Sequence, residues 1–202
     1  MNLTFDADKH EYRLDGNVVP SVTQVLNPLY DLDRIPRDVL ERKRQIGVAL
    51  DAIIELDLAD DLDESTIDEQ LGGYFEAWQR FRQEKKFKPV WTQKRVASLK
   101  YRYAGTPDAW GTMDDHRALV DWKATYAVHP AVALQTAGYE NAVYESFPNI
   151  DRNLRRYGVQ FCDDGRYNIV PYESKQDWAI FLSLLSVHNW RARNGLLTKE
   201  KQ

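Results

Sequence analysis

The stretch Tyr-Ala-Gly-Thr-Pro-Asp-Ala-Trp-Gly-Thr-Met-Asp-Asp-His-Arg-Ala-Leu-Val-Asp-Trp-Lys, residues 103–123, decides the fold of this chain. Two segments of strand-forming residues, 109–112 and 118–122, flank an Asp-Asp turn at 114–115, and this pattern is typical of a β-hairpin. A carboxylate, that of Asp108, stands directly before the first strand. The stretch therefore predicts two paired strands with an acidic residue where the hairpin opens.

The second strand carries two charged residues near its end. Asp121 and Lys123 are two residues apart, so their side chains point to the same face of the sheet. If the strands pair through the turn, both side chains converge with Asp108, while Val120 and Trp122 face the opposite side as core residues. Two adjacent carboxylates repel each other unless a cation lies between them, and oxygen ligands in an open site suit Mg²⁺ or Mn²⁺. Such an ion generates hydroxide from water and neutralises charge on a phosphoryl transition state.

The rest of the chain surrounds this hairpin with helices and further strands. Apolar spacing predicts helices at about 37–62 and 65–86, and further helices are expected from Pro130 and from Ser174. The expected strands are Val90–Ser98, Lys100–Ala104, Ala109–Thr112, Ala118–Trp122, Leu154–Cys162 and Tyr167–Tyr172. This order predicts an α/β fold with a mixed β-sheet flanked by helices.

Length and composition narrow the class of protein further. A chain of 202 residues suits one domain at 1–202, with an N-terminal hairpin and helical part at 1–88 and the sheet with its flanking helices at 89–202. A single cysteine, Cys162, excludes a disulfide framework and an iron–sulfur cluster. No apolar run has the length of a membrane helix, and the first residues lack the apolar segment of a signal peptide. We therefore expect a cytoplasmic protein without membrane contact.

The charges are distributed unevenly along the chain. Residues 1–76 carry 18 acidic and 7 basic residues, whereas residues 77–202 carry 13 acidic and 20 basic residues, within an overall net charge of −4. Such asymmetry suggests that a polyanion would bind the C-terminal part, although solvated helix faces would give the same counts. The candidates for contact with a nucleic-acid backbone are Lys85, Lys86, Lys88, Arg152, Arg155, Arg156, Arg191 and Arg193.

A helix after the hairpin completes a recognisable pattern. Gln135 and Tyr139 are four residues apart, hence on one helical face. Together with Pro107-Asp108 and Asp121-Trp122-Lys123, this arrangement resembles the PD-(D/E)xK nuclease superfamily, and the Gln-x-x-x-Tyr spacing resembles its RecB-type branch. The opening residues, His10-x-Tyr12 and then Pro-Ser-Val-Thr at 20–23, are similar to those of phage-encoded exonucleases and of the mitochondrial genome-maintenance exonuclease. The resemblance implies a restriction-endonuclease-like core.

The resemblance also implies roles for individual residues. Asp108 and Asp121 would bind Mg²⁺ or Mn²⁺, the backbone carbonyl of Trp122 would contribute a further ligand, and Lys123 would be the catalytic lysine. Gln135 and Tyr139 would hold a substrate phosphate or the metal-bound water, so that they count among the catalytic residues.

An upstream helix adds a further acid in this family, commonly in a Gly-x-x-x-His-x-x-x-Glu pattern. Gly47 and Glu55 match that pattern, and Asp51 stands where the histidine would be. Glu55 would thus bind metal. Asp51 either replaces the imidazole on a hard cation or marks an altered or lost second metal site, unless it is an ordinary solvated helix residue.

The function that this resemblance implies is metal-dependent hydrolysis of DNA by an exonuclease that acts on single strands or ends. Its partners would be DNA and a phage or host replication or recombination protein, in the host cytoplasm if the chain is phage-encoded. One alternative is a non-catalytic DNA-binding or end-protecting module on the same fold. A second alternative is a sequence-specific endonuclease.

Overall fold

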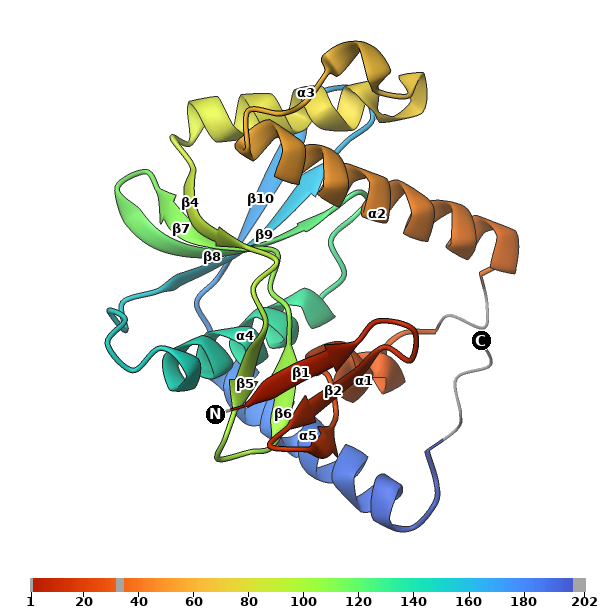
Figure 1. Ribbon diagram of the computed structural model, residues 1–202, viewed down its shortest axis with the longest axis vertical. Helices are drawn as coiled ribbons and strands as arrows, with labels where there is room; N and C mark the ends of the chain where they lie inside the picture. The colour runs from red at the N-terminus through yellow and green to blue at the C-terminus, as the bar shows by residue number, and fades with distance from the viewer. Residues whose placement is uncertain (1, 32–34, 198–202) are drawn as a thin grey trace.

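The computed structural model describes residues 2–31 and 35–197, and its centre is a five-stranded mixed sheet (Figure 1). The strand order is β10-β9-β8-β7-β4. Every neighbouring pair is antiparallel except β8 and β9, which are parallel because a helix connects them. The strands are β4 (Lys88–Thr92), β7 (Ala109–Met113), β8 (His116–Lys123), β9 (Arg155–Phe161) and β10 (Tyr167–Tyr172). The expected hairpin is present, since β7 and β8 pair from Ala109↔Val120 to Met113↔His116.

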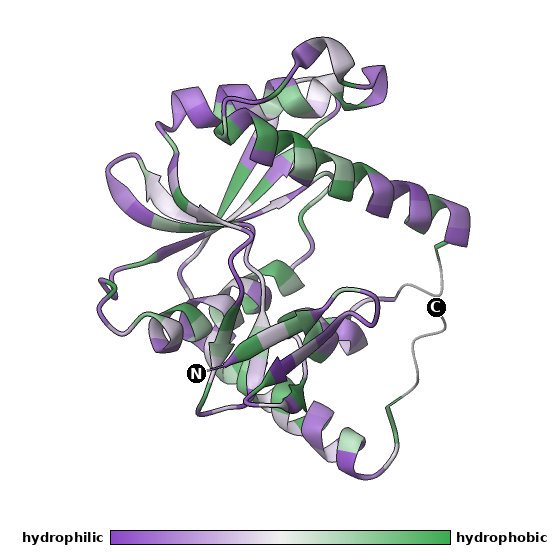
Figure 2. Cartoon of the chain, in the orientation of Figure 1, coloured by the Kyte–Doolittle hydropathy of each residue, from purple (hydrophilic) through white to green (hydrophobic). Residues whose placement is uncertain are grey.

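Helices cover both faces of this sheet, as Figure 1 shows. One face packs against α2 (Arg37–Leu58) and α3 (Glu69–Glu84). The other face packs against α4 (Ala131–Ser146), behind which lies α5 (Gln176–Arg193). Trp78, Phe81 and Trp122 belong to the core on the α2–α3 side, whereas Leu119 and Phe181 belong to the core on the α4 side. In Figure 2, α2 is hydrophilic in its first turns and apolar further along, where Leu50, Ile53 and Ile54 are buried.

The N-terminal residues form a small separate sheet, which packs against Ala97 and Ala104. Its strands are β1 (Leu3–Asp6), β2 (Glu11–Leu14) and β3 (Asn17–Val19), and the short helix α1 (Val22–Leu26) follows. Ser21 and Gln24 form a capping box at the start of α1, in which each side chain bonds to the backbone of the other residue. A parallel bridge between Ser21 and Ala104 joins this part to the segment that precedes the β7–β8 hairpin.

The sequence prediction was wrong for the strand Val90–Ser98. That segment divides into β4 and β5 (Val96–Ser98), and β5 pairs with β6 (Tyr103–Gly105) in a separate two-stranded sheet. The break lies at Gln93, whose backbone is left-handed (φ +47°) and whose N–H donates to the carbonyl of Asp108 at 2.9 Å. This break redirects the chain at the opening of the hairpin.

The helices are close to their expected positions but shorter. The helix expected at 37–62 ends at Leu58, and the one expected at 65–86 begins at Glu69 after Asp68, whose carboxylate accepts the N–H of Gln70. Among residues 2–31 and 35–197, no helix combines the length and the apolar character needed to cross a membrane. The fold is α/β with a mixed sheet flanked by helices, as expected from the order of the elements.

Candidate active site

The hairpin brings three of the expected site residues together. The ammonium of Lys123 lies 2.6 Å from Oδ2 of Asp121 and 3.9 Å from Oδ2 of Asp108. Asp121 is 1% exposed, while the side chains of Asp108 and Lys123 remain 15% and 29% exposed. Two carboxylates and one ammonium thus meet at the end of the central strand β8, with access to solvent from one side.

Asp108 is held by the backbone of β8 itself. Its Oδ2 accepts the N–H of Trp122 at 2.9 Å, and its Oδ1 lies 3.4 Å from the side-chain amide of Gln93. Strand β7 begins only at Ala109, so the Asp108 carboxylate bonds to β8 just beyond the last backbone pair of the two strands. The hairpin register therefore fixes the carboxylate position.

A third carboxylate reaches this site from α2. The indole N–H of Trp122 donates to Oδ1 of Asp51 at 2.7 Å, so Asp51 is tied to the residue between Asp121 and Lys123. A pocket of about 190 Å³ opens here between α2 and the end of β8. Its lining includes Lys43, Gly47, Asp51, Asp108, Lys123 and Thr125.

Gln135 and Tyr139 lie together in the interior, on the α4 side. The Gln135 amide donates to the Tyr139 hydroxyl at 3.2 Å, and both side chains are buried. Tyr139 also packs against the backbone of Gly105, where an added Cβ would lie 2.5 Å from the ring. A larger residue at position 105 would displace the ring, so this glycine is required for the position of Tyr139.

The burial of these groups alters their acidity. Burial, followed by the charge of Asp121, raises the pKa of Asp108 well above its ordinary value. Burial also raises the pKa of Asp121, although Lys123 opposes that change. For Lys123, burial alone would lower the pKa, but Asp121 and Asp108 together outweigh it and the pKa is raised. The ammonium therefore stays protonated at neutral pH.

The donor set fits a hard divalent cation. Apart from the ion pair with Lys123, neither carboxylate oxygen of buried Asp121 has a hydrogen-bond partner in the described residues. In the part of the chain that the structure describes, no group of three His, Cys, Asp or Glu side chains is arranged to hold a metal ion. Two carboxylates, a backbone carbonyl and water would suit Mg²⁺, which commonly keeps several waters and takes one or two carboxylates.

Other expected residues lie apart from this cluster. Glu55 is exposed on α2. Burial is the largest cause of the raised pKa of Asp51, and the negative charge of Glu55 raises it further. Lys85 pairs with Asp114 at 3.7 Å. Arg191 donates to the Leu196 carbonyl beyond the end of α5. The other arginines predicted to contact nucleic acid lie on different elements. They are Arg152 at the Tyr144 ring, Arg155 at the start of β9 and Arg193 at the end of α5.

The prediction that Arg156 contacts a nucleic-acid backbone was wrong, because this residue is 6% exposed and its side chain lies inside the fold. Its guanidinium lies 3.2 Å from Glu140 and donates to Asp177 at 2.9 Å. It also donates to the carbonyls of Ala133 and Ser174 at 2.8 and 3.0 Å. These bonds join β9 to α4 and to the start of α5, so the side chain is not available for contact with DNA.

Several residues near the site were missed by the sequence analysis. Lys43 lines the pocket from α2, two helical turns before Asp51. Tyr30 packs against His129 with ring centroids 4.6 Å apart, and the charges of Lys123 and Asp121 affect its pKa, which burial raises. Both aromatic residues lie outside periodic segments, so no pattern in the sequence distinguishes them.

Comparisons with known proteins support the fold. The sequence matches no protein-family model and no curated protein. A solved structure from Eubacterium rectale, provisionally named an exonuclease, aligns over 77% of this chain and 69% of its own with a TM-score of 0.51 and 12% identity. Two structures of an alkaline exonuclease from Laribacter hongkongensis, one with dAMP, align at TM-scores of 0.34 and 0.37, with 14% and 12% identity. They cover 59% and 89% of this chain, and 68% and 95% of their own. The first likeness, together with the mixed sheet and its flanking helices, confirms the restriction-endonuclease-like α/β fold.

Proposed function

We propose that this protein is a Mg²⁺- or Mn²⁺-dependent deoxyribonuclease of the PD-(D/E)xK type, acting as an exonuclease on single strands or ends. The observation that carries the proposal is the convergence of Asp108, Asp121 and Lys123 at the end of β8, where the buried Asp121 oxygens have no hydrogen-bond partner among described residues. The likeness to a solved structure provisionally named an exonuclease supports it.

The proposed mechanism assigns each side chain a separate task. Asp108, Asp121 and the carbonyl of Trp122 would hold the cation, which when bound supplies hydroxide and charge neutralisation at the phosphoryl group. Lys123, whose pKa is raised by the two aspartates against the effect of burial, would act as an ammonium that stabilises negative charge, not as a general base.

Two further side chains would position the phosphate. Burial, and next the charge of Asp121, raises the pKa of Tyr139, so its hydroxyl stays protonated and able to donate. Gln135 bonds to that hydroxyl and would orient it. Asp51 would hold the Trp122 indole, and thereby the backbone between Asp121 and Lys123, in place.

The test uses the purified protein with end-labelled linear single-stranded DNA and with closed circular DNA, in EDTA, Mg²⁺ or Mn²⁺. We expect cleavage of the linear substrate only, and only with the divalent ion. Cleavage of circular DNA at an equal rate would contradict exonuclease action, and a discrete fragment ladder would indicate a sequence-specific endonuclease. Binding without cleavage under either ion would instead support a non-catalytic module.

Asp108→Asn provides a test of ion binding that does not depend on activity. Because burial and Asp121 raise the pKa of Asp108, its ionised form is disfavoured in the folded protein, and a neutral amide relieves that cost. In EDTA we expect the variant to be more stable by about 1–2 kcal/mol, with a melting temperature higher by roughly 2–8 °C. Mn²⁺ should raise the melting temperature of the wild type and not that of the variant.

The difference in stability between Asp108→Asn and the wild type should depend on pH, because the pKa of Asp108 is raised in the folded protein. A carboxyl with a raised folded-state pKa destabilises the fold when ionised, so lowering the pH toward that pKa should shrink the advantage of the variant. A variant that melts below the wild type in EDTA would contradict the raised pKa of Asp108. A variant that gains as much stability from Mn²⁺ as the wild type would contradict the assignment of Asp108 as an ion ligand.

A further inference from the structure

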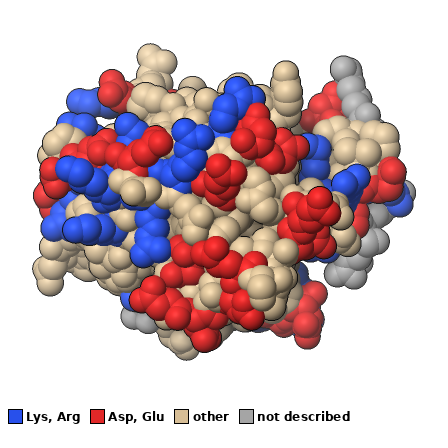
Figure 3. All heavy atoms as spheres, turned by 90° about the horizontal axis from the view of Figure 1, so that it is seen from above, with Lys and Arg blue, Asp and Glu red and all other residues tan. Residues whose placement is uncertain are grey.

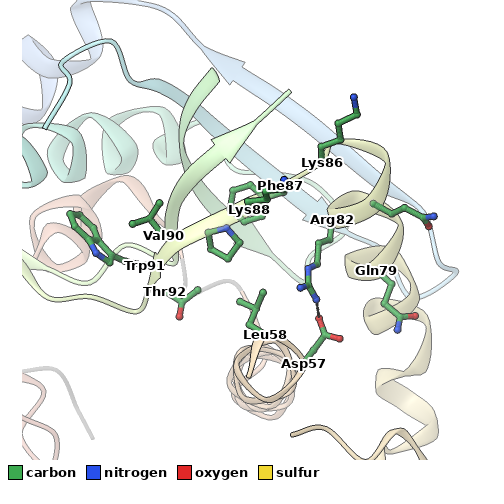
Figure 4. A pocket seen from close by; sticks show the side chains of 12 residues that line it. Asp57, Leu58, Gln79, Arg82, Lys86, Phe87, Lys88, Val90, Trp91 and Thr92 are labelled. Atoms are coloured by element: carbon green, nitrogen blue, oxygen red, sulfur yellow. Dashed lines mark hydrogen bonds and ion pairs between the residues drawn. The ribbon is translucent and has the colours of Figure 1, made fainter. Parts of the chain in front are cut away.

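A second hollow, larger than the site pocket, lies along the free edge of the central sheet. Its volume is about 920 Å³, and it is enclosed by β4, the later turns of α2 and the later turns of α3. Figure 4 shows β4 on one side of this groove and Arg82 reaching from α3 toward Asp57 on α2 across it. Strand β4 is the last strand of the sheet, so its outer edge has no neighbouring strand in the described sheet. We call this hollow the β4 groove.

The β4 groove begins next to the proposed active site. Its lining includes Thr92, which pairs with Ala109, the residue after Asp108. The next residue, Gln93, donates its N–H to the Asp108 carbonyl. Helix α2 also joins the two places, since Asp51 lines the site pocket and Leu58 lines the groove, about 10 Å further along the helix axis.

The charges in the groove favour an anion. Lys86 and Lys88 line it, both are exposed, and among the described residues no ion pair joins either ammonium to an acidic side chain. The acid in the lining, Asp57, is already neutralised, because its Oδ2 accepts from Arg82 at 2.8 Å and from the Trp78 indole at 2.7 Å. Figure 3 shows Lys and Arg side chains gathered on the left of this view, with acidic side chains among them.

The shape of the edge disfavours a peptide strand as the occupant. Pro89, the second residue of β4, has no backbone N–H, and the pairing with β7 is irregular between Pro89 and Trp91. An added peptide strand would therefore miss part of its hydrogen-bond ladder. Trp91 also lines the groove, but its ring already packs on Trp110 and Phe147. The lysines and side-chain amides of the lining are therefore the groups that offer polar contacts to an occupant.

We propose that the β4 groove binds the sugar–phosphate backbone of a DNA strand whose end lies in the active site, without regard to base sequence. The inference rests on the proposed nuclease function, and it assigns Lys86 and Lys88 to phosphates away from the reacting one. The length of β4, about 13 Å for its four residue steps, matches about four nucleotides at the 3.4 Å rise of a stacked strand.

The test compares two double variants with equal changes in charge. Lys86→Gln/Lys88→Gln removes the groove lysines, and Lys9→Gln/Lys100→Gln removes two exposed lysines on β-turns elsewhere. Fluorescence anisotropy with an oligonucleotide of about 12 nucleotides, in EDTA, measures binding. We expect affinity to fall by about 5- to 10-fold in the groove variant alone, and its salt dependence (log K against log salt) to become shallower by about 1.4.

Cleavage measurements on long and short substrates distinguish DNA binding in the groove from the reaction in the active site. We expect kcat/KM for the long oligonucleotide to fall in the groove variant, with turnover of a dinucleotide unchanged. Equal behaviour of both double variants in binding would overturn the proposal, and so would an equal loss on dinucleotide and long substrate. If the wild type binds DNA through these lysines but cleaves nothing, the groove stands and the nuclease function fails.

Discussion

Replacing Asp121 by asparagine is expected to reduce metal-dependent cleavage by at least about 100-fold, because even the outer partners of metal ligands typically contribute 10- to 100-fold. Asp121 is buried, and in the described residues its oxygens have no partner beyond Lys123. An amide has nearly the same shape but lacks the charge that would bind the cation. Single-turnover cleavage of labelled linear DNA measures the loss, and circular dichroism verifies the fold.

The matched control for this variant lies on the same hairpin. Asp114→Asn makes the same chemical change at the turn, where the backbone is left-handed (φ +47°) and the side chain pairs loosely with Lys85 at 3.7 Å. Asparagine tolerates that backbone conformation, so activity should remain within about 2-fold of the wild type, as for most surface changes. Full activity of Asp121→Asn would show that the site does not perform the reaction.

Replacing Arg156 by methionine is expected to have the largest effect on stability. The change leaves the buried Asp177 and the partly buried Glu140 without their cation, and two backbone carbonyls without a donor. Breaking a buried ion pair from one side typically costs about 3–5 kcal/mol, which for a chain of this length lowers the melting temperature by roughly 6–20 °C. Thermal unfolding followed by circular dichroism measures this shift.

The neighbouring Arg155 supplies the control, since it is exposed and Arg155→Met should change stability by no more than about 0.5 kcal/mol. The pH dependence gives a second check. Burial already raises the pKa of Glu140 while Arg156 opposes it, so removing the arginine should raise that pKa further. A raised folded-state pKa means that the penalty falls as the carboxyl is protonated, so the deficit of Arg156→Met should shrink toward acidic pH. A loss below about 1 kcal/mol would contradict the buried network.

The hairpin could be predicted from sequence because its signals are local. Alternation, the turn at 114–115 and the two-residue spacing of Asp121 and Lys123 all act within one supersecondary unit. The break in Val90–Ser98 could not be predicted in the same way. Gln93 adopts a left-handed backbone, and its N–H bonds to Asp108, fifteen residues away. Tertiary contacts, which short-range patterns do not contain, determine that conformation.

The positions of other candidates depend on the tertiary fold in the same way. Asp51 and Glu55 share a helical face, yet Asp51 bonds to Trp122 while Glu55 is exposed one turn later. Helical spacing shows that two residues share a face of the helix, but not which turns of that face pack against the sheet. Arg156 belongs to a run of basic residues that resembles a solvated patch, and the alternation of β9 turns this member inward. Runs of charged residues in the sequence therefore identified candidates, but they did not show which of the side chains are buried.

The hydrogen bond from the Trp122 N–H to Asp108 joins a backbone amide directly to a side chain of the proposed site. An amide proton is sensitive to the charge of its acceptor, and this acceptor changes charge when Asp108 is protonated or coordinates an ion. The nitrogen–proton resonance of Trp122 in an NMR spectrum is thus a built-in reporter for that carboxylate. Titration of the protein with acid or with Mg²⁺ can be followed at one peak, in the absence of any nucleic acid, and the affinity for the ion can be measured on the unmodified chain.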